Sequence, residues 1–318
     1  MKPPYEISPK ILKYVASISE KIGEVNAAHL NKPKTSLRKS NRIKTIQASL
    51  EIEGNTLTVE QITALVNNKR VLAPEKDILE VTNAIAVYDK IKQLNPVSIR
   101  DFKSAHKILM SQLVKNAGKF RTTEVGILKG SKVAHLAPPG HLVDPLMKDL
   151  FEFVKKDHEI PLIKSCVFHY ELEFIHPFID GNGRMGRLWQ TALLIQQYPV
   201  FEFIPIETII KAKQEEYYNA LSKSDKSGNS TAFIVFMLNV IDLSLDHLLK
   251  TQRVNLSEFE RIQLFKEIIG SQQFSRKDYL RQYMEISPAT ASRDLKKAAE
   301  RKIITKSGDK RMTKYKFN

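Results

Sequence analysis

The chain has 318 residues, of which 42% are apolar, and its formal net charge is +15. This composition excludes fibrous, collagen-like and wholly disordered proteins, and the length suits two or three folded domains. The basic excess favours anionic partners such as nucleotides or nucleic acid, and the N-terminal residues lack the apolar stretch of a signal peptide. The longest apolar run, residues 233–238, is far shorter than a membrane span, so we expect a cytoplasmic protein.

A helical pattern dominates the first 250 residues. In residues 78–94, 99–114 and 142–156 the apolar side chains recur three and four positions apart, which is the spacing of one face of an α-helix. Few glycines interrupt these segments. The sequence therefore predicts a mainly α fold.

Residues 120–136 (FRTTEVGILKGSKVAHL) interrupt this helical pattern. β-Branched residues lie on both sides of Lys129-Gly130-Ser131, which is typical of two strands joined by a tight turn. Pro138-Pro139-Gly140 then stops any continuing regular structure. The segment is therefore predicted to be a small β-hairpin.

A second interruption, FIHPFIDGNGRMGR at residues 174–187, lies between helices predicted over residues 161–175 and 185–197. Gly181 and Gly183 allow a tight turn and the close approach of a ligand. They stand at the start of the second helix, where unpaired N–H groups favour an anion. Arg184 and Arg187 share one face near this positive helix end, an arrangement that a polyphosphate would stabilise.

Two further residues of this loop can carry chemistry. Asp180 offers a hard oxygen ligand for Mg²⁺ that bridges phosphates, and His176 can accept a proton near neutral pH, as the activation of a hydroxyl nucleophile requires. Other histidines, His106 and His169 among them, show no metal-ligand spacing and are expected to be structural or surface residues. The alternative interpretation is a glycine-rich turn with surface arginines, which explains any two of these features but not all of them together.

The tail of the chain, residues 255–318, contains 15 Lys or Arg and 8 Asp or Glu. Helices are predicted over residues 259–269 and 276–284, and Ser287-Pro288 is typical of the start of a third helix that runs to residue 302. A small hairpin follows, and this order of elements is typical of a winged helix-turn-helix domain. Its basic residues suit DNA phosphates or an acidic protein surface. They include Arg293, Lys296, Lys297, Lys310, Arg311, Lys314 and Lys316.

The loop of residues 176–187 resembles the signature of the Fic family, H-x-F-x-[DE]-G-N-G-R-x-x-R, and matches it at every defined position. The resemblance extends over residues 99–243. It implies a Fic-type helical bundle with residues 1–95 as an N-terminal helical region, 96–250 as the catalytic core and 256–318 as the winged-helix domain. It also implies a protein adenylyltransferase that moves AMP from ATP, with Mg²⁺, onto a hydroxyl side chain (Ser, Thr or Tyr) of a target protein and releases pyrophosphate. Gly183 stands where the related Doc-type kinases have lysine, which favours AMP transfer.

The resemblance assigns roles position by position. His176 is expected to be the general base, Asp180 the Mg²⁺ ligand and Arg187 the contact of the γ end of ATP. The hairpin at residues 120–136 corresponds to the flap that clamps the side chain of the target. The expected nucleotide-binding residues are Gly181, Asn182, Gly183, Arg184, Met185, Gly186 and Arg187, with Tyr217 in the adenosine pocket and Ile127 of the flap near the nucleotide.

Residues 49–54 (SLEIEG) resemble the inhibitory motif of the family, [ST]-x-x-x-E-[GN]. Residues 45–53 are predicted to be helical, with Gly54 just beyond the helix end. The resemblance implies that Glu53 forms a two-bond pair with Arg187 and occupies the seat of the γ-phosphate, so that the enzyme inhibits itself.

Three alternatives remain open from the sequence. The tail at residues 256–318 could make the protein a DNA-binding transcriptional regulator. The same site could remove AMP from a target, with Glu53 orienting a water molecule. Winged helices also serve as dimer modules, so a homodimer is a further hypothesis, whereas no membrane partner is expected.

Overall fold

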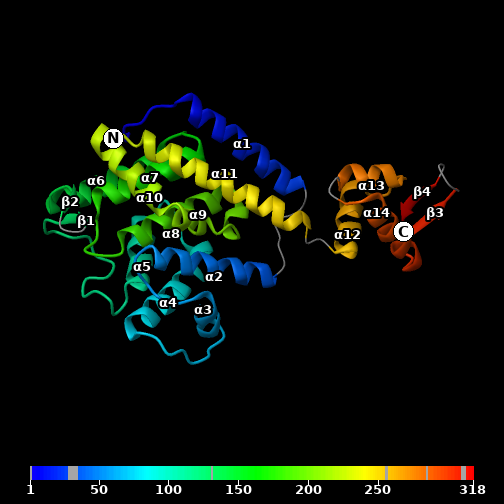
Figure 1. Ribbon diagram of the computed structural model, residues 1–318. Helices are drawn as coiled ribbons and strands as arrows, with labels where there is room; N and C mark the ends of the chain where they lie inside the picture. Colours follow the sequence, from blue (N-terminus) through cyan, green and yellow to red (C-terminus); the bar gives the residue numbers. More distant parts are fainter. Residues whose placement is uncertain (1, 28–34, 130–131, 255–256, 284–285, 309–312) are drawn as a thin grey trace. The chain divides into compact units, whose positions relative to one another are not determined.

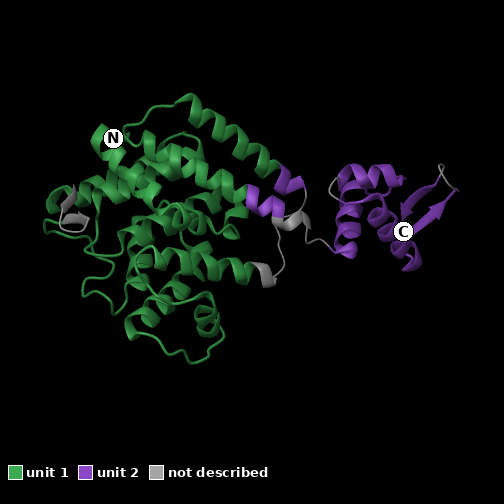
Figure 2. Ribbon diagram, viewed as in Figure 1, with its two compact units in different colours: residues 1–23, 31–245 green, residues 24–30, 246–318 purple. Residues whose placement is uncertain are grey.

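The computed structural model describes residues 2–27, 35–129, 132–254, 257–283, 286–308 and 313–318, and among these only the backbone at residues 35–37, 126–129, 132–136 and 251–254. The chain divides into two compact units (Figure 2). Unit 1 comprises residues 1–23 and 31–245, and unit 2 comprises residues 24–30 and 246–318. Helices make up most of the described residues, so the predicted mainly α class is confirmed.

The elements of the first part of the chain are helices and one two-stranded sheet (Figure 1). In chain order they are α1 (Pro9–Ala27), α2 (Thr35–Glu51), α3 (Val59–Val66), α4 (Glu75–Tyr88), η1 (Ile91–Gln93), α5 (Ile99–Leu109), β1 (Gly126–Lys129), β2 (Lys132–Leu136), α6 (Gly140–Lys156), α7 (Pro161–Ile175), α8 (Asn182–Gln197), η2 (Pro199–Glu202), α9 (Ile206–Ala212), α10 (Gln214–Ser227) and α11 (Thr231–Val254).

Capping side chains and residues with a positive φ determine where several of the helices begin and end. α5 begins after Ser98, whose hydroxyl accepts a hydrogen bond from the Asp101 N–H. It ends at Leu109, before the predicted residue 114, because the chain turns through Gln112 at a positive φ of 60°. α8 begins at Asn182, three residues before its predicted start, since the preceding Gly181 already takes up the left-handed conformation that caps the helix.

The predicted β-hairpin is present as the antiparallel pair β1–β2. Gly126 lies opposite Leu136 and Lys129 opposite Lys132. The two ends of the hairpin segment meet at Gly140, where an added Cβ would lie 2.2 Å from the backbone of Thr122. Only glycine fits this crossing, so Gly140 fixes where the chain leaves the hairpin and enters α6.

The core of unit 1 surrounds α7, α8 and the loop between them. Phe102 of α5 lies with its ring centroid 5.0 Å from Trp189 of α8, 5.5 Å from Phe151 of α6 and 5.4 Å from Phe178 of the loop. All four rings are buried. Burial of one such ring is worth about 2 kcal/mol, so Phe178 anchors the loop to the hydrophobic core.

α1 lies along α11 (Figure 1), where Ser17 and Lys21 contact Asp242 at 2.7 and 2.8 Å. By length and composition the segment Thr231–Lys250 of α11 could cross a membrane. However, 61% of its apolar stretch is buried inside the protein, a property that core helices share.

Unit 2 contains α12 (Glu258–Ile269), α13 (Arg276–Gln282), α14 (Pro288–Glu300), β3 (Ile304–Ser307) and β4 (Lys314–Phe317). The hydroxyls of Ser257, Ser275 and Ser287 cap the three helices, and the predicted start of the third helix at Ser287-Pro288 is confirmed. β3 and β4 pair antiparallel. The helices and strands share an apolar core that includes Phe265, Phe274, Tyr279, Leu295 and Phe317.

Candidate active site

The loop between α7 and α8 leaves the first helix at His176. This residue is in the left-handed conformation (φ 50°), and its N–H donates to the Leu172 carbonyl oxygen at 2.9 Å. A non-glycine residue in this region is strained, and such positions persist where the surrounding structure fixes them. The turn at His176 therefore has to be held by other contacts.

One of these contacts comes from inside the loop. The amide side chain of Asn182 accepts from the Phe178 N–H and donates to the Phe178 carbonyl oxygen, both at 2.9 Å. The ring of Phe178 also stacks on His106, with 3.5 Å between the centroids. His106 accepts from the Gly118 N–H at Nδ1, so its Nε2 is the donor to the Asp180 carbonyl oxygen at 2.9 Å. Burial lowers the pKa of His106 to about 4, which keeps this uncharged bridge intact at neutral pH.

The buried Arg121 provides the second hold. Its guanidinium donates to the carbonyl oxygens of His176 and Ile175 at 2.7 and 3.0 Å. It also donates to the carbonyl oxygens of Thr123 and Pro138, both at 2.7 Å, which flank the β1–β2 hairpin. One side chain thus joins the base of the hairpin to the residue that is expected to be the general base.

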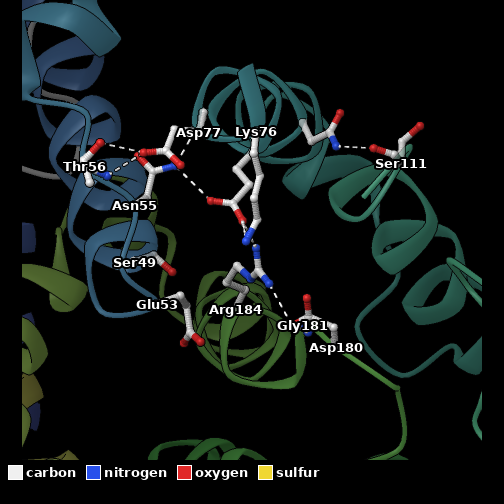
Figure 3. Close-up of polar contacts among 12 residues, drawn as sticks. Ser49, Glu53, Asn55, Thr56, Lys76, Asp77, Ser111, Asp180, Gly181 and Arg184 are labelled. Atoms are coloured by element: carbon white, nitrogen blue, oxygen red, sulfur yellow. Dashed lines mark hydrogen bonds and ion pairs between the residues drawn. The ribbon is translucent and has the colours of Figure 1, made fainter. Parts of the chain in front are cut away.

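Arg184 lies in a polar cluster between α4, α8 and the loop (Figure 3). Its guanidinium contacts Glu80 at 3.2 Å and Asp180 at 2.9 Å. Oε2 of the same Glu80 accepts from the Asn55 side chain at 2.9 Å. Glu80 therefore connects the arginine of the loop motif to the turn that follows α2.

Asp180 faces outward, with 53% of its side chain exposed. Its Oδ1 accepts from the Gly181 N–H at 2.6 Å as well as from Arg184. Among the described residues, no group of three His, Cys, Asp or Glu could hold a metal ion. Mg²⁺ bound to a nucleotide needs only one or two carboxylates besides phosphate and water oxygens, so Asp180 fits as a single protein ligand.

The first turn of α8 is an anion-binding element. The N–H groups of the first turn have no acceptor within the helix, and the N-cap residue Gly181 has no side chain to cap them. The helix dipole adds partial positive charge there. At Gly183 an added Cβ would lie 2.7 Å from Oε1 of Glu53, so the carboxylate of Glu53 rests directly on this turn.

Arg187 completes the cluster and is buried. Its Nε donates to the Ser49 hydroxyl at 3.0 Å, and its Nη2 donates to the Ser49 carbonyl oxygen at 2.9 Å and to Oε1 of Glu53 at 2.7 Å. Burial lowers the pKa of Arg187, but Glu53 foremost raises it, so that the pKa lies above its usual value and the group is charged. The contact expected between Glu53 and Arg187 is present, as one hydrogen bond in place of the expected two.

The turn that carries Glu53 is held from two sides. Asn55 donates to the Asp77 carbonyl oxygen at 3.1 Å, and the Thr56 N–H donates to Oδ2 of Asp77 at 3.0 Å (Figure 3). From the other side Gln214 donates to the Ile52 carbonyl oxygen at 3.1 Å. Glu53 itself keeps 30% of its side chain exposed, so solvent or a ligand can reach it.

The other residues that were predicted to contact the nucleotide are Met185, Gly186, Tyr217 and Ile127. Met185 is fully buried, and Gly186 allows α8 to approach α7, since a Cβ there would lie 2.6 Å from His169. Tyr217 is buried, with its hydroxyl 3.2 Å from Oε1 of Glu173. The backbone of Ile127 belongs to β1, and its side chain, with its expected contact to the nucleotide, lies outside the described part of the structure.

Sequence reasoning missed Glu80 and Arg121, which hold residues of the motif from a distance, and Glu173, which lies beside Gly183 at the start of α8. It regarded His106 and His169 as structural or surface residues, and both hold site residues. One available signal was the spacing of His169 and Glu173, which lie one turn apart on the helix that leads into the loop.

Comparisons with known proteins agree with this geometry. A family model described as Fic/DOC family matches residues 96–194. A crystal structure of a Fic family protein from Desulfovibrio desulfuricans G20 is 37% identical, with a TM-score of 0.77 over 100% of this chain and 98% of that chain.

Curated relatives are described as protein adenylyltransferases. Protein adenylyltransferase Fic of Nematostella vectensis is 28% identical over 75% of this chain and 57% of its own length. Protein adenylyltransferase fic-1 of Caenorhabditis briggsae is 30% identical over 54% of this chain and 34% of its own length. The chain therefore spans less than two thirds of the length of these relatives.

Proposed function

The chain belongs to the Fic family, and we propose from this membership that it is a protein adenylyltransferase, which transfers AMP from ATP to a hydroxyl side chain of a target protein. The observation that supports this most is the start of α8, where Arg187 donates to an anionic group that lies beside Gly183 of the first helical turn. In this structure that group is the carboxylate of Glu53. A carboxylate and a phosphate make the same charge-assisted hydrogen bonds, so the same seat suits the phosphates of ATP.

In the proposed reaction the hydroxyl oxygen of the target attacks the α-phosphorus of ATP. A P–O bond to the target forms while the bond between the α-phosphorus and the leaving pyrophosphate breaks, and the hydroxyl proton passes to His176. Arg121, which holds the His176 carbonyl oxygen and the base of the hairpin, keeps the base aligned with a target bound along that hairpin. The exposed edges of a two-stranded hairpin can bind such a segment through backbone hydrogen bonds.

The α8 amides and Arg187 would stabilise the charge of the phosphates, and Asp180 would hold Mg²⁺. The ion supplies further charge neutralisation when bound. Arg184 is joined to Asp180 and Glu80 and would keep Asp180 turned toward the phosphates. Glu53 would inhibit the enzyme because its carboxylate occupies the place of the terminal phosphate.

The test is incubation of the wild type, Glu53→Gly and His176→Ala with ATP labelled at the α-phosphate, Mg²⁺ and cell lysate. We expect label on protein with Glu53→Gly, at least tenfold more than with the wild type, and none above background with Glu53→Gly/His176→Ala. The control is Glu51→Gln, at the same helix end, because Glu51 pairs with Lys211 and not with Arg187, and glutamine preserves the last helical turn. Equal labelling by the wild type and Glu53→Gly would contradict the inhibition, and absence of label with every variant would contradict AMP transfer.

We also propose that unit 2 contains a winged-helix domain that binds DNA phosphates. Arg276 and Lys277 of α13 and Arg293 and Lys296 of α14 are exposed. Arg276 contacts Ser292 of α14 at 2.9 Å, so these basic side chains lie on adjoining surfaces of the two helices. We expect DNA affinity that falls steeply with salt and is unaffected by His176→Ala, measured by titration of a labelled duplex. Salt-independent binding would contradict this second proposal.

A further inference from the structure

The hydrogen-bond partners of Arg187 described above all come from one segment. Ser49 lies on α2 and Glu53 on the turn that follows it, and together they accept from Nε and Nη2 of Arg187. In the proposed function this segment has to leave the phosphate seat before ATP can bind productively. Arg187 would then lose these partners in the state in which it has to hold the nucleotide.

A second carboxylate lies near Arg187 and belongs to the helices of the catalytic loop. Glu173 is on α7, with only 13% of its side chain exposed. A Cβ added at Gly183 would lie 3.2 Å from Nη1 of Arg187 and 3.5 Å from Oε1 of Glu173. The guanidinium and this carboxylate therefore flank the same residue at the start of α8.

A chain of buried side chains holds Glu173 in place. The Tyr217 hydroxyl lies 3.2 Å from Oε1 of Glu173 and 3.2 Å from Nε2 of His169. Nδ1 of His169 contacts Oε1 of Gln190 at 2.6 Å. These residues come from α7, α8 and α10, so the chain does not depend on α2.

The charge of Glu173 is consistent with this arrangement. Burial raises its pKa, but the nearby His169 and then the positive charge of Arg187 bring the pKa below its usual value. Glu173 is therefore ionised at neutral pH and remains so with a positive charge next to it.

We propose that Glu173 is a positioning residue for Arg187. When the α2 segment withdraws, Glu173 keeps the guanidinium directed at the first turn of α8, where the terminal phosphates bind. Glu53 competes with the nucleotide, whereas Glu173 supports its binding, although both are carboxylates beside the same arginine. This inference rests on the proposed function, since it concerns the nucleotide seat of that reaction.

The test uses the full-length chain in the Glu53→Gly background, in which the seat is open. Dissociation constants for ATP and AMP with Mg²⁺ are measured by calorimetry for Glu53→Gly alone and with Glu173→Gln, Arg187→Ala or both. We expect Glu173→Gln to raise the Kd for ATP about tenfold and to leave that for AMP unchanged, because AMP lacks the phosphates that Arg187 reaches. In the Arg187→Ala background Glu173→Gln should have no further effect, as a double-mutant cycle requires of a residue that acts through another.

In labelling assays the same substitution should raise the KM for ATP with little change in kcat, a split that a folding defect would not produce. The matched control is Glu171→Gln, an acidic residue two positions earlier on α7, for which ATP binding should not change. An unchanged or lower Kd for ATP with Glu173→Gln, or an equal loss with and without Arg187, would overturn the inference. If Glu53→Gly alone binds no ATP, the proposed function is wrong, and the inference that rests on it is wrong as well. This result differs from an unchanged Kd for ATP with Glu173→Gln, which overturns the inference alone.

Discussion

Each unit contains an ion pair between a buried arginine and a carboxylate, and the two pairs differ in how enclosed the carboxylate is and in how many hydrogen bonds it accepts. In unit 2, Arg261 of α12 makes two hydrogen bonds to Asp294 of α14, at 2.7 and 3.1 Å, and the Tyr279 hydroxyl donates to the same carboxylate at 3.1 Å. In unit 1, Arg187 makes one hydrogen bond to Glu53. Asp294 is 3% exposed and Glu53 30% exposed.

The difference separates a structural pair from a replaceable one. The carboxylate of Asp294 is enclosed and fully bonded, so no other anion can take its place without unfolding the domain. Glu53 contributes one oxygen from a partly exposed turn, so in the proposed function a phosphate would replace it at little cost to the fold. Accessibility and the number of bonds, more than the presence of an ion pair, indicate which arginine serves a ligand.

The largest effect that tests this comparison is expected in the enclosed pair. Asp294→Ala leaves Arg261 charged and buried, which should cost about 3–5 kcal/mol of the stability of unit 2. Hydrogen exchange of the amides in residues 257–283 and 286–308, followed by mass spectrometry, measures this loss. AMP transfer by the Glu53→Gly background should not change. Asp278→Ala, which removes the partner of the Ser275 helix cap and an exposed contact with Arg281, should cost about 1 kcal/mol and serves as the control.

A second test concerns the acidic groups around Arg187, which include the buried Glu207 of α9. Burial raises the pKa of Glu207 to about 7, above its ordinary value of 4.5. Its Oε2 has no hydrogen-bond partner among the described residues. Between pH 4.5 and 7 Glu207 is therefore protonated in the folded state but has lost its proton in the unfolded state. The stability of unit 1 consequently falls as the pH rises through this range.

The expected loss is on the order of 2–3 kcal/mol between pH 4.5 and pH 8, and Glu207→Gln should remove most of it. Urea unfolding followed by the fluorescence of Trp189, the single tryptophan of the chain, measures the stability of unit 1. If both proteins lose the same stability over this pH range, Glu207 is not the responsible group.

A third test uses a buried arginine without a carboxylate partner at hydrogen-bond distance. Arg121 donates to four backbone carbonyl oxygens at His176, Ile175, Thr123 and Pro138. Lysine keeps the charge but cannot span these acceptors, so Arg121→Lys should lower kcat about tenfold by misaligning His176. Steady-state labelling in the Glu53→Gly background measures kcat, and an unchanged Kd for ATP shows that the phosphate seat is intact. An unchanged kcat would contradict the positioning role.

The smallest effect is expected at Ser49, which shares Arg187 with Glu53. Ser49→Ala removes the hydroxyl acceptor of Nε and leaves the backbone acceptor in place. Loss of one such hydrogen bond is worth about 1 kcal/mol, so AMP transfer should rise about fivefold, below the effect of Glu53→Gly. The initial rate of labelling measures this, and a rise equal to that of Glu53→Gly would mean that Ser49 holds the inhibitory segment.

The sequence predicted the features that are contiguous along the chain. The mainly α class, the hairpin at residues 120–136 and the turn between α7 and α8 follow from periodicity, turn residues and the glycines of one short motif. The contact of Glu53 with Arg187 was expected through the family resemblance alone. Periodicity could not have found it, because the two residues are 134 positions apart.

The residues that hold the site were not predictable in this way. Arg121 lies 55 positions before His176, and Glu80 lies 104 positions before Arg184. Their roles depend on how helices far apart in the sequence pack together, which no local pattern records. Buried polar side chains of this kind are identified only when each donor and acceptor can be matched in three dimensions.

The placement of Ser49 and Glu53 on one helix end has a consequence for how the enzyme would respond to a signal. The two residues are four positions apart, so unwinding the last turn of α2 withdraws both from Arg187 in a single event. The two contacts would then be lost together. An activating partner would then need to contact only that turn to remove both contacts from Arg187.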